Sequence, residues 1–265
     1  MSGPLLDCEA VSVRFGGLTA VDQVSFTLSR GEILGVIGPN GAGKSTLFNA
    51  ITGIYRASSG RVRFAGTELI GRSAHQIVKL GIARTFQSSR LFVDMSVLDN
   101  VVIGLHTRTR TGVLDAVLRY GYARRELEAA AARAEELLRA VSSDLFEQRY
   151  RRAGELAQAD RRRLEIARAL ASEPRLLLLD EPSSGMDDKE TRALVRDIRE
   201  ICRERPDLSI IIIEHDMSVV AELPGRVMVL DYGRKIAEGT FDSVRALEHV
   251  QQAYLGGASA HARAS

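Results

Sequence analysis

The residues with the clearest chemical meaning form one glycine-rich stretch, 38–46, with the sequence GPNGAGKST. Gly38, Gly43, Lys44 and Ser45 stand at the spacing Gly-x-x-x-x-Gly-Lys-Ser, which is that of a phosphate-binding loop. Glycines let successive backbone N–H groups turn inward and surround phosphate. The lysine reaches the β- and γ-phosphates, and the serine hydroxyl is a ligand for Mg²⁺. This stretch therefore predicts binding of a nucleoside triphosphate together with Mg²⁺.

Such a loop needs a strand before it and a helix after it. The apolar run 33–37 is typical of a short buried strand, and residues 47–51 can begin a helix. The positive end of that helix dipole would point at the bound phosphates. A glycine-rich turn that merely precedes a lysine is the alternative, and it does not explain this strand–loop–helix context.

A pair of acids forms the second chemical pattern. Asp180 and Glu181 follow the four leucines at 176–179, which predict a fully buried strand. In an open parallel sheet, ligands bind at the carboxyl ends of the strands. Asp180 is suited to hold the Mg²⁺ shell, and Glu181 to polarise water toward the γ-phosphate. Two exposed acids after a strand would be the plainer interpretation, but the phosphate loop upstream favours a shared site.

Three single side chains extend this candidate site, and each has a plainer alternative. Phe15 precedes a double-glycine turn and could stack on a purine base, although a core or edge phenylalanine fits as well. Gln87 ends an expected strand and could reach Mg²⁺ and the attacking water, although such glutamines are usually surface residues. His215 follows a run of four isoleucines and could contact the γ-phosphate, although a lone histidine is more often structural.

The remaining patterns predict the elements that hold these residues. Alternating apolar residues at 5–30 predict antiparallel strands, and 60–70 predicts a further hairpin. An alanine-rich stretch that ends at Val141 predicts a long helix with one weakly apolar face. Other helices are expected at 74–80, 155–171, 190–205 and 242–255, and another strand at 227–230.

Composition limits the function classes. The chain has 265 residues, enough for one large domain or two small ones, and its net charge of +2 argues against a nucleic-acid partner. Cys8 and Cys202 suggest neither a disulfide framework nor a zinc site, which favours a reducing compartment. Because no apolar run is long enough to cross a bilayer and the N-terminus is unlike a secretion signal, we expect a soluble protein. Any membrane role would come through a partner.

Taken together, these motifs carry a family resemblance. The loop 38–45, Gln87, the segment LLLLDEP and His215, in this order and at these intervals, resemble the nucleotide-binding subunit of an ABC transporter. The segments GIARTFQSSRLF, RRLEIARAL and IEHDM, an insertion near 104–125 and the ending AYLG are similar to the ATP-binding protein of branched-chain amino acid uptake systems.

That resemblance covers about residues 5–256 and implies a single α/β nucleotide-binding domain of the P-loop NTPase, ABC type. It would combine an antiparallel β subdomain, a RecA-like parallel sheet core and a helical subdomain at about 90–172. The last residues, 257–265, are small and polar, and we expect a disordered tail there.

The resemblance also implies a role for each site residue. Phe15 would stack on adenine, Glu181 would be the general base, and His215 would contact the γ-phosphate. Mg²⁺ and water would be organised by Ser45, Gln87 and Asp180. The ATP phosphates would be bound by Gly38, Pro39, Asn40, Gly41, Ala42, Gly43, Lys44, Ser45 and Thr46.

ATP hydrolysis coupled to transport follows from the same resemblance. The implied partners are a second ATP-binding subunit, two membrane permease subunits and, indirectly, a periplasmic solute-binding protein, and residues 183–187 would face the second ATP-binding subunit. The chain would lie peripherally on the cytoplasmic face of the inner membrane. The substrate stays open among branched-chain amino acids, amides and urea, because the residues that select it belong to other subunits.

Three other functions can be weighed against this one. Lipopolysaccharide export uses an ATPase of the same superfamily, but the insertion after residue 104 argues against it. An ATPase of DNA repair or translation would carry two nucleotide domains or a long coiled coil. A regulatory module that binds ATP without hydrolysis is disfavoured because Glu181 and His215 are both present.

One segment departs from the family pattern. The signature Leu-Ser-Gly-Gly-Gln reads LAQAD at 156–160. Ala157 lacks the serine hydroxyl, and Ala159 replaces the glycine whose N–H meets the γ-phosphate held by the other subunit. Because the uptake systems resemble heterodimers, we expect an asymmetric pair in which this chain's phosphate loop works against an intact signature. A homodimer, and hydrolysis supported by LAQAD itself, are the open alternatives.

Overall fold

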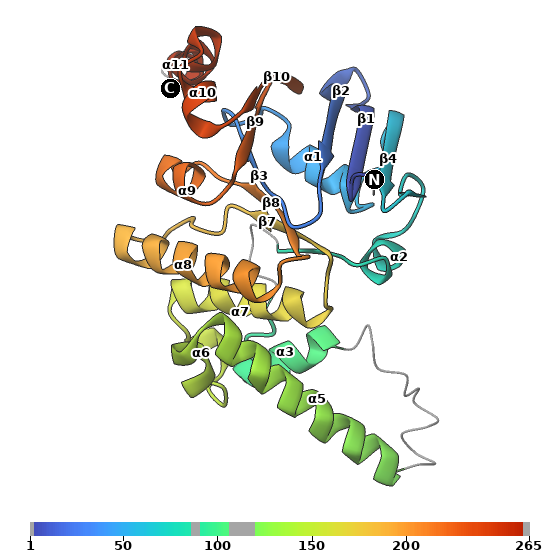
Figure 1. Cartoon of the computed structure of the whole chain (residues 1–265), viewed down its shortest axis with the longest axis vertical. Helices are drawn as coiled ribbons and strands as arrows, with labels where there is room; N and C mark the ends of the chain where they lie inside the picture. The colour runs from blue at the N-terminus through green and yellow to red at the C-terminus, as the bar shows by residue number, and fades with distance from the viewer. Residues whose placement is uncertain (1–2, 86–90, 106–119, 262–265) are drawn as a thin grey trace.

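The N-terminal part of the chain folds as an antiparallel sheet (Figure 1). In the computed structural model, which describes residues 3–85, 91–105 and 120–261, β1 (Leu6–Phe15) pairs with β2 (Leu18–Leu28) across the double-glycine turn. On the other side of β1 lies β4 (Ser59–Phe64), which continues into β5 (Thr67–Glu68). Both hairpins expected from the alternating patterns are confirmed.

A second, mostly parallel sheet forms the centre of the molecule. Its strand order is β10-β9-β3-β8-β7-β6. All neighbours pair in parallel except β9 and β10, which are antiparallel. Along the chain these strands are β3 (Ile33–Ile37), β6 (Ile82–Arg84), β7 (Leu176–Asp180), β8 (Ser209–Ile213), β9 (Arg226–Asp231) and β10 (Arg234–Gly239).

The leucine run in β7 is continuous because both of its faces are buried. Leu176 and Leu178 belong to a core shared with the antiparallel sheet and with α1 (Lys44–Ile51). Leu177 and Leu179 belong to a second core on the opposite face, against helices. A strand covered on both sides has no solvent face that would favour polar residues. The parallel sheet therefore separates two hydrophobic cores, one on each face, and the ends of its strands lie between these cores.

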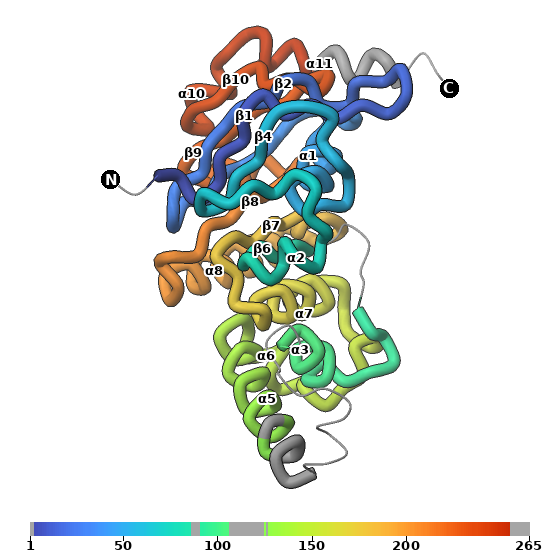
Figure 2. The backbone as a smooth tube through the Cα atoms, turned by 90° about the vertical axis from the view of Figure 1, so that its right-hand side faces the viewer, coloured from blue at the N-terminus to red at the C-terminus, as the bar shows by residue number. Residues whose placement is uncertain are grey.

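Four of the helices that contribute to the second core form the lower half of the molecule (Figures 1 and 2). They are α3 (Val97–Leu105), α5 (Tyr120–Val141), α6 (Ser143–Glu147) and α7 (Gln158–Ala171), with the 3₁₀ turn η1 (Ala153–Glu155) before α7. The other helices beside the sheets are α2 (Ala74–Lys79), α8 (Asp188–Glu204) and α9 (Met217–Glu222). The alanine-rich stretch thus forms a long helix, as expected. Among the described helices, none combines the length and the apolar character that spanning a bilayer would require.

Two helix boundaries differ from the sequence-based expectation near the candidate site. α1 begins at Lys44 rather than at residue 47, because Gly43 takes a left-handed conformation and opens the helix directly from the loop. α7 begins at Gln158 rather than at residue 155, because η1 precedes it and Ala157, its N-cap, has extended backbone angles. The LAQAD segment therefore lies at the start of a helix.

The single terminal helix expected at 242–255 is wrong. The structure has two helices there, α10 (Phe241–Arg245) and α11 (Glu248–His261). Val244 and Val250 are both buried in the same small core, and their spacing does not match a helical period of about 3.6 residues. A break lets both side chains reach that core. α11 runs past residue 257, where we expected the tail to begin, and residues 262–265 lie outside the described part of the chain.

Candidate functional site

The loop between β3 and α1 requires glycine at its two ends. Gly38 has φ of 148°, and a Cβ there would lie 2.0 Å from the carbonyl oxygen of Leu230. Gly43 has φ of 95°, and a Cβ there would lie 2.4 Å from the carbonyl oxygen of Ala20. At both positions a Cβ would collide with a backbone carbonyl oxygen, so the loop needs glycine there, as the motif predicts.

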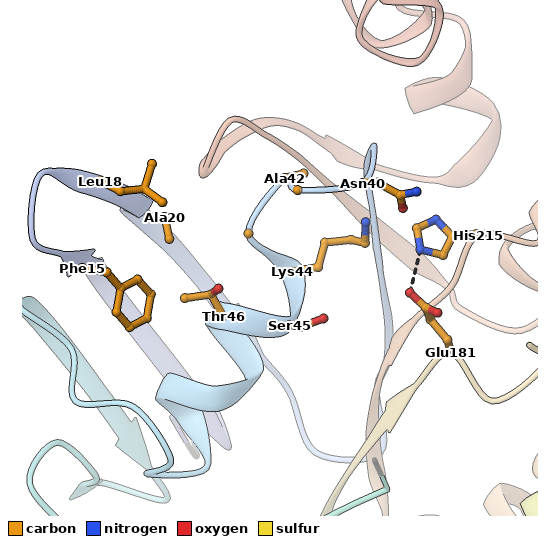
Figure 3. Close-up of a pocket in the computed structure, with 12 residues that line it drawn as sticks. Phe15, Leu18, Ala20, Asn40, Ala42, Lys44, Ser45, Thr46, Glu181 and His215 are labelled. Atoms are coloured by element: carbon orange, nitrogen blue, oxygen red, sulfur yellow. Dashed lines mark hydrogen bonds and ion pairs between the residues drawn. The ribbon is translucent and has the colours of Figure 1, made fainter. Parts of the chain in front are cut away.

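A cavity of about 430 Å³ opens over this loop (Figure 3). Its lining consists of Phe15, Leu18, Ala20, Asn40, Gly41, Ala42, Gly43, Lys44, Ser45, Thr46, Glu181 and His215. The volume suits a small-molecule ligand. The fold thus brings three distant parts of the sequence together: the loop, the acid after the leucine strand, and the histidine after the isoleucine strand. Gly38, Pro39 and Asp180 are not part of the lining, and Gln87 lies outside the described residues.

Leu18 and Ala20 line the cavity although the sequence analysis assigned them no role. Both lie on β2, which folds back beside β1 immediately after the double-glycine turn. That turn was the available signal, because it places the first residues of β2 next to Phe15.

Lys44 is held inside the loop. Its side chain is buried, and Nζ donates hydrogen bonds to the carbonyl oxygens of Gly38, at 2.7 Å, and Pro39, at 3.0 Å. Burial lowers the pKa of the Lys44 ammonium, while the charges of Glu181 and Asp180 act in the opposite direction. The cation therefore stands in the loop, where negative phosphate charge would offset its cost of burial.

Phe15 lies at one end of the cavity, and Glu181 with His215 at the other (Figure 3). Phe15 is 45% exposed as a residue, and its ring packs edge-on against Tyr55, with ring centroids 5.1 Å apart. The structure thus excludes a buried core phenylalanine, one of the two alternatives left open by the sequence, and leaves the edge phenylalanine open. An exposed aromatic ring beside a phosphate loop is suited to stack on a flat heterocycle.

Glu181 and His215 meet because β7 and β8 are neighbours. Nε2 of His215 lies 2.7 Å from Oε1 of Glu181, so the imidazole donates a hydrogen bond to the carboxylate. The backbone N–H of Glu181 donates to the carbonyl oxygen of Ile213 at 2.9 Å, which ties the two strand ends together. Glu181 has φ of 48°, an unusual conformation for a residue other than glycine, and such conformations concentrate at functional sites.

A buried carboxylate, Glu214, joins the loops that carry this pair. It accepts hydrogen bonds from the backbone N–H groups of Ser183, at 2.9 Å, and His215, at 3.2 Å. Burial raises the pKa of Glu214, although these N–H groups oppose the shift. The sequence analysis gave Glu214 no role, because nothing in the local pattern shows that its side chain turns inward.

The raised pKa of Glu214 predicts a pH-dependent stability. A carboxyl group whose pKa is higher in the folded state binds protons more tightly there, so its contribution to stability falls as pH rises above the ordinary glutamate value of 4.5. Glu214→Gln removes this titration. We therefore expect the melting temperature of Glu214→Gln minus that of wild type to increase as the pH is raised from 5 to about 7. Thermal unfolding of both proteins at each pH measures this difference. A constant difference across that range would contradict the assignment.

Asp180 offers one oxygen to a metal shell. Its carboxylate is buried, and Oδ2 lies 2.7 Å from a guanidinium nitrogen of Arg84. Oδ1 is also buried and makes no hydrogen bond to any residue in the part of the chain that the structure describes. A buried carboxylate oxygen without a partner, together with the Ser45 hydroxyl in the cavity, fits the oxygen ligands and retained waters that Mg²⁺ prefers.

The amino-acid sequence matches known proteins over most of its length. Residues 21–184 match the model of the ABC transporter family. High-affinity branched-chain amino acid transport ATP-binding protein LivG of Salmonella typhimurium is 41% identical over 97% of this chain and 99% of the relative. The corresponding BraF protein of Pseudomonas aeruginosa is 38% identical over the same shares of the two chains.

Solved structures agree with the fold described above. An ATP-binding cassette of an ABC transporter in its ADP conformation superposes with a TM-score of 0.82, at 29% identity, over 96% of this chain and 99% of that one. A nucleotide-free cassette gives the same TM-score at 28% identity, over 95% of this chain and 99% of that one. The parallel sheet, the antiparallel sheet and the helical half are thus those of an ATP-binding cassette. The phosphate loop, the family match and these relatives together show that the chain belongs to the ABC transporter family, as a member that binds and hydrolyses ATP.

Proposed function

We propose that this chain is the ATP-hydrolysing subunit of an importer that takes up branched-chain amino acids or related small polar solutes. The assignment of the substrate rests on the near full-length similarity to proteins named for branched-chain amino acid transport. The assignment of ATP hydrolysis rests on the cavity, because a phosphate loop, an acid and a histidine all line it. Amide or urea uptake and lipopolysaccharide export are the alternative transport roles.

Within the cavity, the residues divide by chemistry. The nucleotide base would lie against the exposed ring of Phe15. The phosphates would accept hydrogen bonds from backbone N–H groups of the loop 38–46, except at Pro39, which has no N–H. Lys44 would exchange its two loop carbonyls for phosphate oxygens. The helix that begins at Lys44 adds its positive dipole end to the same place.

Hydrolysis would then proceed at the other end of the cavity. Water attacks the γ-phosphorus, the bond to the bridging oxygen breaks, and ADP and phosphate leave. Glu181 takes the proton of the attacking water as the general base. His215 holds the Glu181 carboxylate in the present structure and would contact the γ-phosphate once ATP is bound.

Mg²⁺ would be held by Ser45, Asp180 and Gln87. Bound there, the ion would neutralise charge on the phosphate oxygens. The buried Oδ1 of Asp180, which has no hydrogen-bond partner among the described residues, and the hydroxyl of Ser45 support this assignment. Gln87 lies outside the described residues, so its place in the set remains a proposal from the sequence.

A second ATP-binding subunit would complete the site through its signature segment. The corresponding LAQAD segment of this chain starts α7 without any side-chain cap, because Ala157 has no hydroxyl. Ala159 is buried, where the family pattern has glycine. We therefore propose a heterodimer in which this chain's own phosphate loop is the efficient one.

Restoring the glycine tests this asymmetry. Ala159→Gly is expected to raise phosphate release by the assembled transporter several-fold. Without the Ala159 methyl group, the backbone N–H of this position can approach the γ-phosphate held by the other subunit, and a hydrogen bond made in the transition state lowers the barrier. Glycine also costs about 1 kcal/mol in a helix. Ala169→Gly, near the other end of α7, carries that cost alone and is the matched control. Equal turnover of Ala159→Gly and wild type would contradict the asymmetric pair.

Membrane partners would dock beside the segment that follows Gln87. Phe92, Val93 and Met95 are exposed apolar side chains there, which is the kind of surface that marks a protein contact. We propose that two permease subunits bind at this face, with a periplasmic solute-binding protein beyond the membrane. The chain would then lie peripherally on the cytoplasmic face of the inner membrane.

Uptake in cells tests the transport role directly. A strain without this chain should lose ATP-dependent uptake of labelled leucine, and wild-type protein should restore it where Glu181→Gln does not. Labelled urea, a short amide and lipopolysaccharide transport are measured in the same strains. Leucine uptake that survives the deletion would contradict the branched-chain assignment, and a defect confined to another substrate would replace it.

A further inference from the structure

A buried arginine joins the acidic end of β7 to the helix of the phosphate loop. Arg84 is the last residue of β6, and its side chain is only 7% exposed. One terminal nitrogen lies 2.7 Å from Oδ2 of Asp180, and the other lies 2.6 Å from Oδ1 of Asn49 on α1. The guanidinium carbon lies 5.4 Å from the ring centre of Phe48, which also belongs to α1. Arg84 therefore contacts both elements that flank the phosphate site.

The residue that follows β6, Thr85, also holds the backbone of Asp180. The N–H of Asp180 donates to Oγ1 of Thr85 at 3.3 Å, and the N–H of Thr85 donates to the carbonyl oxygen of Leu178 at 2.9 Å. Backbone and carboxylate of Asp180 are thus fixed by two successive residues, Arg84 and Thr85. One carboxylate oxygen is occupied by this arrangement, and the other is left buried without a partner among the described residues.

A buried ion pair is a costly way to stabilise a fold. Desolvating two charges often costs as much as their attraction returns, and an apolar pair of similar volume packs at least as well. The planar guanidinium does give something that an apolar pair cannot, because its fixed fork sets the orientation of a carboxylate and of a second acceptor at once.

We propose that Arg84 is a positioning residue for the metal-binding carboxylate. It holds Oδ2 of Asp180 so that Oδ1 faces the Mg²⁺ shell, and through Asn49 it couples this carboxylate to α1, which carries Lys44 and Ser45. The inference rests on the proposed role of Asp180 at Mg²⁺. It assigns Arg84 a part in metal recognition without any contact to the metal or to the nucleotide.

Mg²⁺ dependence separates this role from a purely structural one. The full-length chain is titrated calorimetrically with a non-hydrolysable ATP analogue, in EDTA and along a series of Mg²⁺ concentrations. Arg84→Lys keeps the charge but loses the fork that reaches both Asp180 and Asn49. We expect unchanged affinity in EDTA and a rise of about ten-fold in the Mg²⁺ concentration that gives half of the metal effect, as for other residues that orient a metal ligand.

Two results would overturn the proposal. An unchanged Mg²⁺ requirement in Arg84→Lys would do so, as would a loss of affinity that is equal with and without Mg²⁺. Arg175→Lys is the matched control, because Arg175 also stacks on a phenylalanine, Phe64, and donates to a carbonyl, but at the opposite end of β7. Its Mg²⁺ requirement should stay at the wild-type value.

Two further variants keep the test decisive. Asn49→Ala removes the hydrogen bond from Arg84 to α1 at 2.6 Å and leaves the contact with Phe48 in place, so it serves if Arg84→Lys does not fold. It should raise the Mg²⁺ requirement in the same direction, and no rise would overturn the coupling through Asn49. Asp180→Asn is the reference for the proposed function. If it leaves the Mg²⁺ requirement unchanged, the metal role of Asp180 itself fails. If it changes the requirement while Arg84→Lys does not, only the present inference fails.

Discussion

Phosphate release by an importer assembled with the Glu181→Gln variant is expected to fall at least about 100-fold, the lower range for loss of a general base. Affinity for ATP should stay unchanged. Glutamine fills the same volume and its carbonyl oxygen can still accept the hydrogen bond from His215, 2.7 Å away in the native pair. It cannot take the proton of the attacking water. Steady-state phosphate release and equilibrium ATP binding, measured on the same preparation, check the two halves of this expectation.

Glu9→Gln is the matched control for that change. Glu9 is an exposed residue of β1 that pairs with arginines of β4 and does not line the cavity. Its hydrolysis rate and ATP affinity should equal those of wild type. A Glu181→Gln variant that loses ATP binding together with hydrolysis, or one that keeps full turnover, would contradict the role of Glu181 as the base.

Replacement of Lys44 by methionine is expected to act on binding instead. Methionine keeps the apolar stem but removes the ammonium, and a hydrogen bond from a charged group contributes about 1.5–3 kcal/mol. Affinity for MgATP should therefore weaken by about 10- to 100-fold, since about 1.4 kcal/mol corresponds to a factor of ten. Calorimetric titration of the purified variant with MgATP measures this loss.

Lys79→Met provides the comparison for Lys44→Met. Lys79 is an exposed residue near the end of α2, and its replacement should leave the affinity for MgATP at the wild-type value. Near-native affinity of Lys44→Met would mean that the loop backbone alone holds the phosphates. In that case the buried ammonium would serve only its hydrogen bonds to the carbonyl oxygens of Gly38 and Pro39.

Much of the site could be predicted from the sequence because its functional residues cluster in a few short segments. The glycines, Lys44 and Ser45 occur within one loop, where backbone sterics fix the residue type. The leucine and isoleucine runs predict buried parallel strands, and the carboxyl ends of such strands meet at one edge. Glu181 and His215 are each predicted to act near the γ-phosphate, and the structure places them in hydrogen-bond contact.

Long-range contacts between side chains could not be predicted in the same way. Arg84 looks like an ordinary strand residue until β6 is paired with β7 and its guanidinium reaches Asp180. Glu214 looks like a loop acid until the fold buries it under the N–H of Ser183. The break between α10 and α11 likewise depends on which small core Val244 and Val250 share. Each of these features depends on tertiary packing, which cannot be read from the periodicity of apolar residues in a local segment.

The most direct test of the central claim, that this chain supplies one half of a shared ATP site, is phosphate release measured against protein concentration. With MgATP, we expect little Glu181-dependent release from the purified chain alone and a clear rise when the second ATP-binding subunit is added. A Glu181-dependent rate proportional to the concentration of this chain, and indifferent to the second subunit, would show a site complete within one chain and contradict the claim. A rate that rises more steeply than concentration would show that the chain pairs with itself, and would contradict the asymmetric heterodimer.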